Sequence, residues 1–215
     1  MNEAHPLATM LLDAANGRLP PADGAVEVIP SPPGPCDAVV AFTAHHIVAA
    51  NVDRGDVMHR VPVDDLGSPM RAPFLAWLGA QLGTEPGMLD IVLVPARDPG
   101  DPPLKLVPRS DLLDHPRLAR SRLYRRDLRV FTDPDERALV LVGRGLAGRW
   151  ELGIEVAADH RNQGLGRELI LAAPSLVPEG EPLFAQVSPG NVASLRAFIA
   201  AGYRPIGAEV LFLKR

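Results

Sequence analysis

Three short β-prone runs stand one after another in the second half of the chain, and they restrict the fold more than any other feature. They are "LRVFT" at 128–132, "ALVLVG" at 138–143 and "WELGIEV" at 150–156. The "DPDE" turn between the first two predicts a hairpin, and the third run predicts a further antiparallel strand. Such a beginning favours a mostly antiparallel sheet over a regular alternation of strands and helices.

The segments around these runs complete an α/β pattern of the α+β type. The predicted order from about residue 110 is α, β, β, β, α, β, α, β, β, which describes a mixed, mostly antiparallel sheet flanked by helices. The last helix covers 191–202, with Asn191 as its cap and Gly202 at its end. Its expected buried stripe consists of Val192, Leu195, Phe198 and Ile199. The runs 203–207 and 209–214 are expected to be two closing strands.

A proline-rich segment divides the sequence. Residues 98–110 contain four prolines, which predicts a boundary between an N-terminal αβ region at 1–100 and a second domain at 101–215. The order of elements predicted for the first region is strand, strand, helix, strand. This order is weakly similar to the order predicted for the second domain. We interpret the first region as a decayed half-copy that lacks a cofactor site and supplies one wall of a substrate cleft.

Charge and composition narrow the class of protein. The net charge is −4 and no Lys/Arg-rich run is present, so nucleic-acid binding is not expected. Residues 117–129 hold six arginines spaced among leucines, which favours a solvated helix face. No apolar run is long enough for a membrane span, and the N-terminus lacks the features of a signal peptide. With Cys36 as the single cysteine, no internal disulfide can form, and a cytoplasmic location is expected.

A glycine turn follows the third strand, in the stretch "DHRNQGLGRELI" at 159–170. A dinucleotide-binding turn would require a third glycine at the position of Leu169, and no Gly-Lys-Ser/Thr follows as in a phosphate loop of that type. The first N–H groups of a helix lack internal partners and lie at the positive end of its dipole. Gly164 and Gly166 at that end predict a cradle for a diphosphate, with Arg161 and Arg167 as charged partners. Taken alone, the turn is also compatible with a purely structural link.

The surroundings of the turn carry a resemblance. The pattern Arg161-x-x-Gly164-x-Gly166, placed after "ELGIEV" and before "NVASLRAFIAAGY", resembles the GNAT superfamily of acyl-CoA N-acyltransferases over residues 120–215. The resemblance implies the GNAT fold, acetyl-CoA bound with its pyrophosphate on the N–H groups of 162–167, and no metal. It also implies that strand 152–156 separates from the next strand and pairs with the pantetheine arm. The implied cofactor-binding residues are Ile154, Val156, Arg161, Asn162, Gln163, Gly164, Leu165, Gly166, Arg167, Asn191 and Ser194.

The resemblance further implies direct transfer of an acetyl group to a primary amine of a small molecule or peptide. Such an amine has a pKa near ~10.4 and must lose a proton before it attacks, which a carboxylate or a water chain can assist. Glu155 and Glu151 lie four residues apart on the cofactor strand and are the catalytic candidates. Other acyl donors and a hydroxyl acceptor stay open, as does a homodimer.

Two aromatic residues depart from the pattern of the family and bear on the proposed acetyl transfer, and three histidines are considered as site residues. Phe198 stands where the family commonly has a tyrosine acid, and Tyr203 stands at a position that normally packs in the core. A non-catalytic module that binds or senses coenzyme A is therefore the alternative function. His45 and His46 should project to opposite faces of a strand, so they cannot chelate one metal together, and His160 is expected at the surface.

Overall fold

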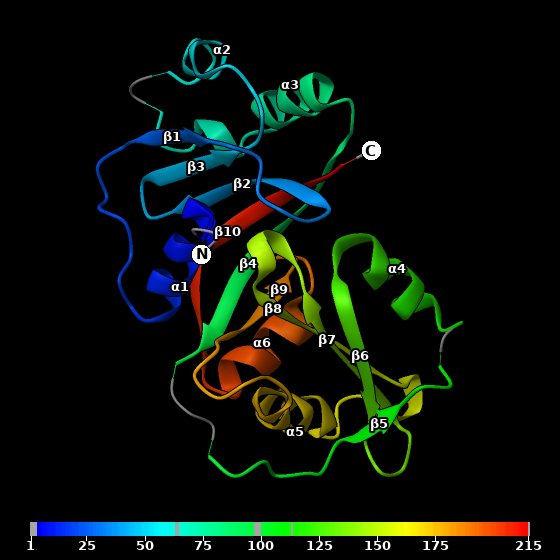
Figure 1. Ribbon diagram of the computed structural model, residues 1–215. Helices are drawn as coiled ribbons and strands as arrows, with labels where there is room; N and C mark the ends of the chain where they lie inside the picture. The colour runs from blue at the N-terminus through cyan, green and yellow to red at the C-terminus, as the bar shows by residue number, and fades with distance from the viewer. Residues whose placement is uncertain (1–3, 63–64, 97–99, 113, 215) are drawn as a thin grey trace. The chain divides into compact units, whose positions relative to one another are not determined.

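The computed structural model describes residues 4–62, 65–96, 100–112 and 114–214. The chain forms two compact units (Figure 1). Unit 1 comprises residues 1–91, 146–148 and 206–215, and unit 2 comprises residues 92–145 and 149–205. The strands β4 (Pro86–Pro95) and β10 (Tyr203–Leu213) have residues in both units.

These units differ from the expected division at about residue 100. The division falls inside β4, whereas the first residues of the proline-rich segment 98–110 lie outside the described part of the chain. Residues 206–215 join unit 1 because β10 pairs antiparallel with β2 (Cys36–Phe42). Composition marks a loop, but it does not reveal which distant strands pair. The functional regions 1–100 and 101–215 stay a prediction.

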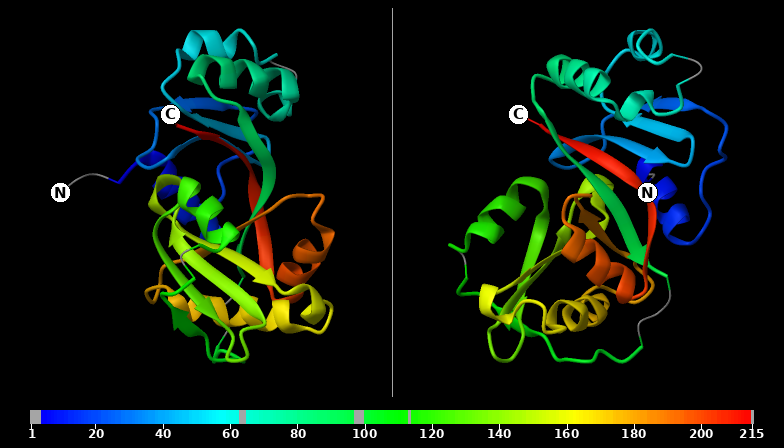
Figure 2. Two further views of the ribbon diagram at one scale, coloured as in Figure 1. Left: turned by 90° about the vertical axis from the view of Figure 1, so that its right-hand side faces the viewer. Right: turned by 180° about the vertical axis from the view of Figure 1, so that it is seen from behind.

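Unit 1 contains a sheet in the order β1-β3-β2-β10, followed by β4. Its elements are α1 (Pro6–Ala15), β1 (Val26–Ile29), β2, β3 (His45–Ala49), α2 (Arg54–Met58), the 3-10 turn η1 (Ser68–Met70), α3 (Ala72–Leu82) and the 3-10 turn η2 (Leu146–Gly148). The strands β2 and β3 form an antiparallel hairpin with Phe42 opposite His45. Figures 1 and 2 show α1 and α3 on opposite sides of these strands.

The core of unit 1 lies between its sheet and α3. Val39 and Val48, which are paired across the hairpin, are fully buried together with Leu78 of α3 and Phe212 of β10. The helix ends at Gly83, whose φ of 66° is left-handed and therefore suits glycine. This is the helix of the strand, strand, helix, strand order predicted for the first region, and the structure confirms it.

The strand β10 corrects one expectation. It runs without a break from Tyr203 to Leu213, whereas the sequence predicted two strands separated near Gly207. A Cβ at Gly207 would lie 2.4 Å from the carbonyl oxygen of Ala41 on β2. The glycine therefore permits close approach of two backbones, a role that only the paired strand reveals.

Unit 2 contains a sheet in the order β4-β9-β8-β7-β6-β5. Its elements are β5 (Val107–Arg109), α4 (Pro116–Tyr124), β6 (Arg126–Thr132), β7 (Ala138–Arg144), β8 (Trp150–Val156), the 3-10 turn η3 (Ala158–His160), α5 (Leu165–Ala172), the 3-10 turn η4 (Ala173–Leu176), β9 (Leu183–Val187) and α6 (Val192–Ala200). Pairing is antiparallel from β5 to β8 and parallel between β8 and β9. The predicted mixed α/β fold with a mostly antiparallel sheet is confirmed. None of the described helices has the length and apolar composition needed to cross a bilayer.

Helices cover both faces of this sheet, with α4 on one side and α6 on the other (Figure 2). Leu118 of α4 is 2% exposed and packs against Leu139 and Leu141 of β7. On the other side, α5 contacts β8 and α6. Separate helical layers therefore cover the two faces of the sheet of unit 2.

The orientation of α6 differs from the prediction. Asn191 caps the helix as expected, accepting a hydrogen bond from the Ser194 N–H at 3.2 Å. Of the expected buried stripe only Phe198 is buried, while Val192 is 57% and Ile199 54% exposed. The inward face carries Asn191, Ser194 and Phe198, which recur at helical spacing. The helix is therefore turned so that a partly polar stripe faces the other elements of unit 2, while Val192 and Ile199 face away from them.

The β6–β7 hairpin depends on a buried aspartate. Asp133 is fully buried and accepts hydrogen bonds at 2.8 Å from the Ala138 N–H and from Nε of Arg137. Burial alone would raise the pKa of Asp133, but these hydrogen bonds outweigh it and hold the pKa below its usual value of 3.8. The Asp133 carboxylate therefore accepts the hydrogen bond of the Ala138 N–H, which a backbone carbonyl would accept in a regular ladder.

We expect Asp133→Asn to lower the free energy of unfolding at neutral pH by about 1–3 kcal/mol, because it weakens a charge-assisted bond. Since the folded pKa is depressed, the carboxylate's contribution is complete above its unfolded pKa of 3.8 and is lost as the pH falls through the folded pKa. The difference between the two proteins should therefore shrink as the pH falls below 3.8. Urea titrations at neutral and acid pH measure it, and an equal difference at both would contradict this role.

Candidate active site

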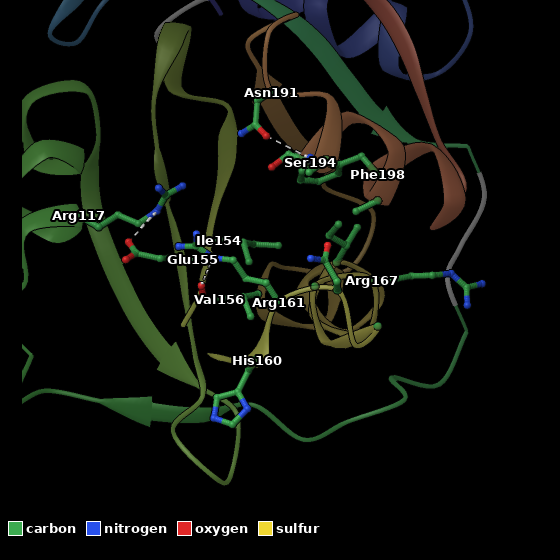
Figure 3. Close-up of a pocket in the computed structure, with 16 residues that line it drawn as sticks. Arg117, Ile154, Glu155, Val156, His160, Arg161, Arg167, Asn191, Ser194 and Phe198 are labelled. Atoms are coloured by element: carbon green, nitrogen blue, oxygen red, sulfur yellow. Dashed lines mark hydrogen bonds and ion pairs between the residues drawn. The ribbon is translucent and has the colours of Figure 1, made fainter. Parts of the chain in front are cut away.

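Unit 2 contains a pocket of about 550 Å³ beside the end of β8. Its walls come from β8, the turn after it, the first turns of α5, the inward face of α6 and the start of α4 (Figure 3). The lining residues are Arg117, Ile154, Glu155, Val156, His160, Arg161, Asn162, Gly164, Gly166, Arg167, Ile170, Asn191, Ala193, Ser194, Ala197 and Phe198. The pocket therefore gathers most of the residues predicted to bind the cofactor. Gln163 and Leu165 are not among its lining residues.

The glycine turn forms the floor at the N-terminus of α5. Gly164 is the N-cap with a φ of 90°, and Asn162 has a φ of 60°, so both residues adopt left-handed backbone conformations. No side chain caps the first N–H groups of α5. Gly166 lies one residue into the helix and also faces the pocket. An uncapped helix start with glycines at its mouth is suited to an anion.

The two arginines of the turn already have backbone partners. Nε of Arg161 donates to the Val156 carbonyl at 3.1 Å and ties the turn back to β8. Nε of Arg167 donates to the Ala200 carbonyl at 3.0 Å, and in Figure 3 this side chain extends away from the other labelled residues. The expectation that both bind phosphate stays a prediction. Arg161 lies nearer to the glycines and is the better placed of the two.

The strands β8 and β9 separate beside the pocket. Their parallel pairing covers only Trp150–Leu152 and Leu183–Ala185. Beyond Leu152, β8 continues to Val156 along β7 without a β9 partner. The predicted separation of these strands is therefore confirmed. Since Ile154 and Glu155 point to opposite faces of β8 and both line the pocket, the pocket reaches both faces through this gap.

The inward face of α6 forms another wall of the pocket. Asn191 and Ser194 both line the pocket, as expected. Phe198 packs edge-on against Tyr203, with ring centroids 5.0 Å apart. Tyr203 is 4% exposed, its hydroxyl has no hydrogen-bond partner among the described residues, and burial raises its pKa. It is a core residue, as the sequence predicted, and Phe198 brings no acid to the pocket.

Glu155 faces an arginine that the sequence did not single out. Arg117 of α4 and Glu155 both line the pocket and point toward each other, with 4.0 Å between Nε and Oε2 (Figure 3). Burial lowers the pKa of the Arg117 guanidinium, and Glu155 partly offsets this. The six arginines of 117–129 were interpreted as one solvated face. That interpretation is wrong for four of them, because Arg117 and Arg125 point toward β8 and because Arg126 and Arg129 belong to the strand β6.

Glu151 has a different environment from Glu155 although the two share one strand. It is 1% exposed, and its oxygens accept hydrogen bonds from Nε of Arg125 at 2.8 Å and from Nε of Arg149 at 3.0 Å. Arg125 also donates to the Gln186 side chain on β9 at 3.1 Å. Glu151 does not line the pocket. Its geometry is that of a structural carboxylate, so Glu155 is the better catalytic candidate.

The histidines behave as expected from their alternation along β3. His45 is buried between Asp23 and Glu27, at 2.9 and 3.2 Å, while His46 lines a separate pocket of about 230 Å³ in unit 1. Burial lowers the pKa of His46. In unit 2, His160 lines the pocket of about 550 Å³. Among the described residues no group of three or more His, Cys, Asp or Glu could hold a metal ion.

Comparison with known proteins gives structural matches only. No family model matches the sequence, and no curated protein matches it. The structure resembles an acetyltransferase of the GNAT family from Colwellia psychrerythraea, at 13% identity and a TM-score of 0.42, over 67% of this chain and 63% of that one. It also resembles a GCN5-related N-acetyltransferase from Kribbella flavida, at 18% identity and a TM-score of 0.42, over 66% of this chain and 64% of that one. A conserved protein of unknown function from Staphylococcus epidermidis matches at 14% identity and a TM-score of 0.43, over 67% of each chain.

Two of these structures are described as members of the family that the motifs resemble, and each match covers a segment of this chain. The chain spans somewhat less than two thirds of the length of the Colwellia and Kribbella structures. At this identity and TM-score, the likeness concerns the course of the chain and says nothing about the residues of the pocket.

We expect Glu151→Gln to lower the free energy of unfolding by about 3–5 kcal/mol, because it leaves two buried arginines facing a neutral amide. Glu155→Gln, on an exposed side chain of the same strand, is the matched control and should change stability by less than about 1 kcal/mol. Urea unfolding of both variants measures the difference. A stable Glu151→Gln protein would contradict the structural role.

Proposed function

We propose that this protein is an N-acetyltransferase that transfers the acetyl group of acetyl-CoA to a primary amine of a small molecule or peptide. The observation that carries the proposal is the combination, in one pocket, of an uncapped glycine-rich helix start with a gap between two parallel strands. The helix start suits a diphosphate and the gap suits an extended arm. A long cofactor with a charged end and a thin reactive arm requires both features.

The pyrophosphate would lie on the N–H groups of the turn. Residues 162–167 include two positions with positive φ. Turns with such residues can form a concave nest of backbone N–H groups that binds an anion. The turn stays in place because Arg161 binds the Val156 carbonyl. This preorganisation lowers the entropy lost when the anion binds.

The pantetheine arm would pass between β8 and β9, along Ile154 and Val156 and opposite Asn191 and Ser194. Direct transfer then requires a neutral amine beside the thioester carbonyl. The amine nitrogen forms the new C–N bond, the C–S bond breaks, and the sulfur leaves as a thiolate. Glu155, directly or through a water, accepts the proton that the amine loses.

A second candidate is a module that binds coenzyme A without turnover. The observation that favours it is the aromatic pair of Phe198 and Tyr203, which leaves no phenol at the pocket wall. Water would then have to protonate the thiolate. Release of free thiol from acetyl-CoA in the presence of amines separates the two functions, because a binding module releases none.

Acetyl-CoA should raise the melting temperature, since it binds the folded protein. At a hundredfold excess over its Kd it adds about 2.7 kcal/mol, or about 5–10 °C for a chain of this size. Gly166→Leu should abolish this shift. Its backbone is helical and a Cβ there meets only Val156, at an ordinary 3.8 Å, so the fold should tolerate the change while the cradle is filled.

A glycine pair provides the control for this experiment. Gly164 and Gly180 have φ values of 90° and 80°, and a Cβ at either would meet no atom within 4 Å. Alanine at either position should therefore carry a similar backbone strain of about 1–2 kcal/mol. Only Gly164→Ala should weaken the acetyl-CoA shift. If both variants, or neither, lose it, the cradle lies elsewhere.

Glu155→Gln should lower turnover by about 10²- to 10⁴-fold without changing the affinity for acetyl-CoA, because it removes the proton acceptor. Thiol release under saturating acetyl-CoA measures turnover, and the thermal shift measures binding. Full turnover of this variant across about pH 6–9 would assign the base to water or to another residue.

A further inference from the structure

Arg117 is the pocket residue that the proposed cofactor site leaves unexplained. Its Nε is buried and has no hydrogen-bond partner among the described residues, and Glu155 lies 4.0 Å away, beyond hydrogen-bond distance. Other arginines of unit 2 pair closely with carboxylates, such as Arg125 with Glu151 at 2.8 Å and Arg137 with Asp133 at 2.8 Å. The Arg117–Glu155 pair is thus held apart, with both groups facing the pocket.

The surroundings of Arg117 favour an incoming anion. Arg120 and Arg125 lie near enough to add positive potential at its guanidinium, and burial already lowers its pKa. A buried donor without a partner is unfavourable, and an acceptor group of a ligand would remove that cost. The planar guanidinium is matched in shape to a carboxylate.

Glu155 decides which kind of anion fits. A dianionic phosphate bound to Arg117 would be repelled by a carboxylate at this distance. A ligand with one negative group and an adjacent positive group would instead neutralise both side chains. The side chains of Arg117 and Glu155 are 40% and 42% exposed, so each presents a free edge to such a ligand.

We infer that the acceptor is an amine with a carboxylate beside its nitrogen, of the α-amino acid type, bound with its carboxylate on Arg117 and its ammonium on Glu155. This inference rests on the proposed acetyltransferase function. The ammonium gives its first proton to Glu155, which passes it to solvent, and the freed nitrogen lone pair attacks the thioester carbonyl. As the C–S bond breaks, the nitrogen loses its second proton, through water, to the departing thiolate, so that the products are the amide and the free thiol. Arg117 acts here as a specificity-determining residue.

The test compares matched acceptors on the full-length protein. Amino acids are assayed against their carboxamides by thiol release, with rates corrected for the fraction of neutral amine. The free acids should be preferred by about 10- to 100-fold in kcat/KM, the effect of one charge-assisted, two-point contact. Arg117→Met should remove most of this preference, and Arg117→Lys should keep part of it.

Two controls accompany the variant. Arg122→Met changes an exposed arginine of the same helix that does not line the pocket, and it should leave the preference unchanged. The KM of acetyl-CoA should be the same in wild type and Arg117→Met. Circular dichroism of both Arg117 variants verifies that they are folded.

The inference is overturned if carboxamides are used as well as free acids, or if Arg117→Met lowers the rates of both equally. An increase in the KM of acetyl-CoA would instead assign Arg117 to a cofactor phosphate and would also overturn it. These results leave the proposed function intact. If no amine releases thiol although acetyl-CoA shifts the melting temperature, the proposed function fails, and the inference fails with it.

Discussion

The pocket of unit 2 depends on a buried charge cluster at the point where two strands separate. Arg125 donates to Glu151 on β8 and to Gln186 on β9, and the pairing of these strands ends at Leu152 and Ala185. Arg125 thus binds both strands at the end of their shared ladder. Beyond this point the strand β8 has the pocket beside it instead of β9.

Burying such a cluster is not a way to gain stability, because the desolvation of two charges roughly offsets their attraction. Its geometric effect is specific, however. A Cβ at Gly145 would lie 2.1 Å from the carboxyl carbon of Glu151, so only glycine leaves room for the carboxylate there. Arg149 approaches the same carboxylate from within a short loop and stacks over Phe184 of β9. The carboxylate is therefore fixed in one position by groups from several elements.

The contrast between the two glutamates of β8 follows from this arrangement. Glu151 is saturated by arginines at hydrogen-bond distance, whereas Glu155 faces its arginine at 4.0 Å. One carboxylate holds the architecture, and the other is accessible to a ligand. A similar division applies to the arginines. Arg161 holds the glycine turn through the Val156 carbonyl, while Nε of Arg117 has no hydrogen-bond partner within the described part of the chain.

The sequence by itself determined the features that depend on neighbouring residues. The β6–β7 hairpin, the cap at Asn191 and the glycine turn at Gly164 are local, because turn residues and helix caps act within a few positions. The order of elements from α4 to α6 also followed from local periodicity, whereas β5 was not predicted and β10 replaces two predicted strands. These features were sufficient to locate the wall of the pocket that the glycine turn and the start of α6 form.

Only the tertiary structure decided which face each element buries and which distant side chains meet. Apolar spacing suggested that Val192 and Ile199 are buried, yet packing of α6 turns them outward. Alternation placed Glu151 and Glu155 on one face, but it could not show that Arg125 reaches the first and Arg117 the second. These contacts join residues more than 25 positions apart in the chain. Their geometry is set by the packing of α4 on the sheet, which no local pattern encodes.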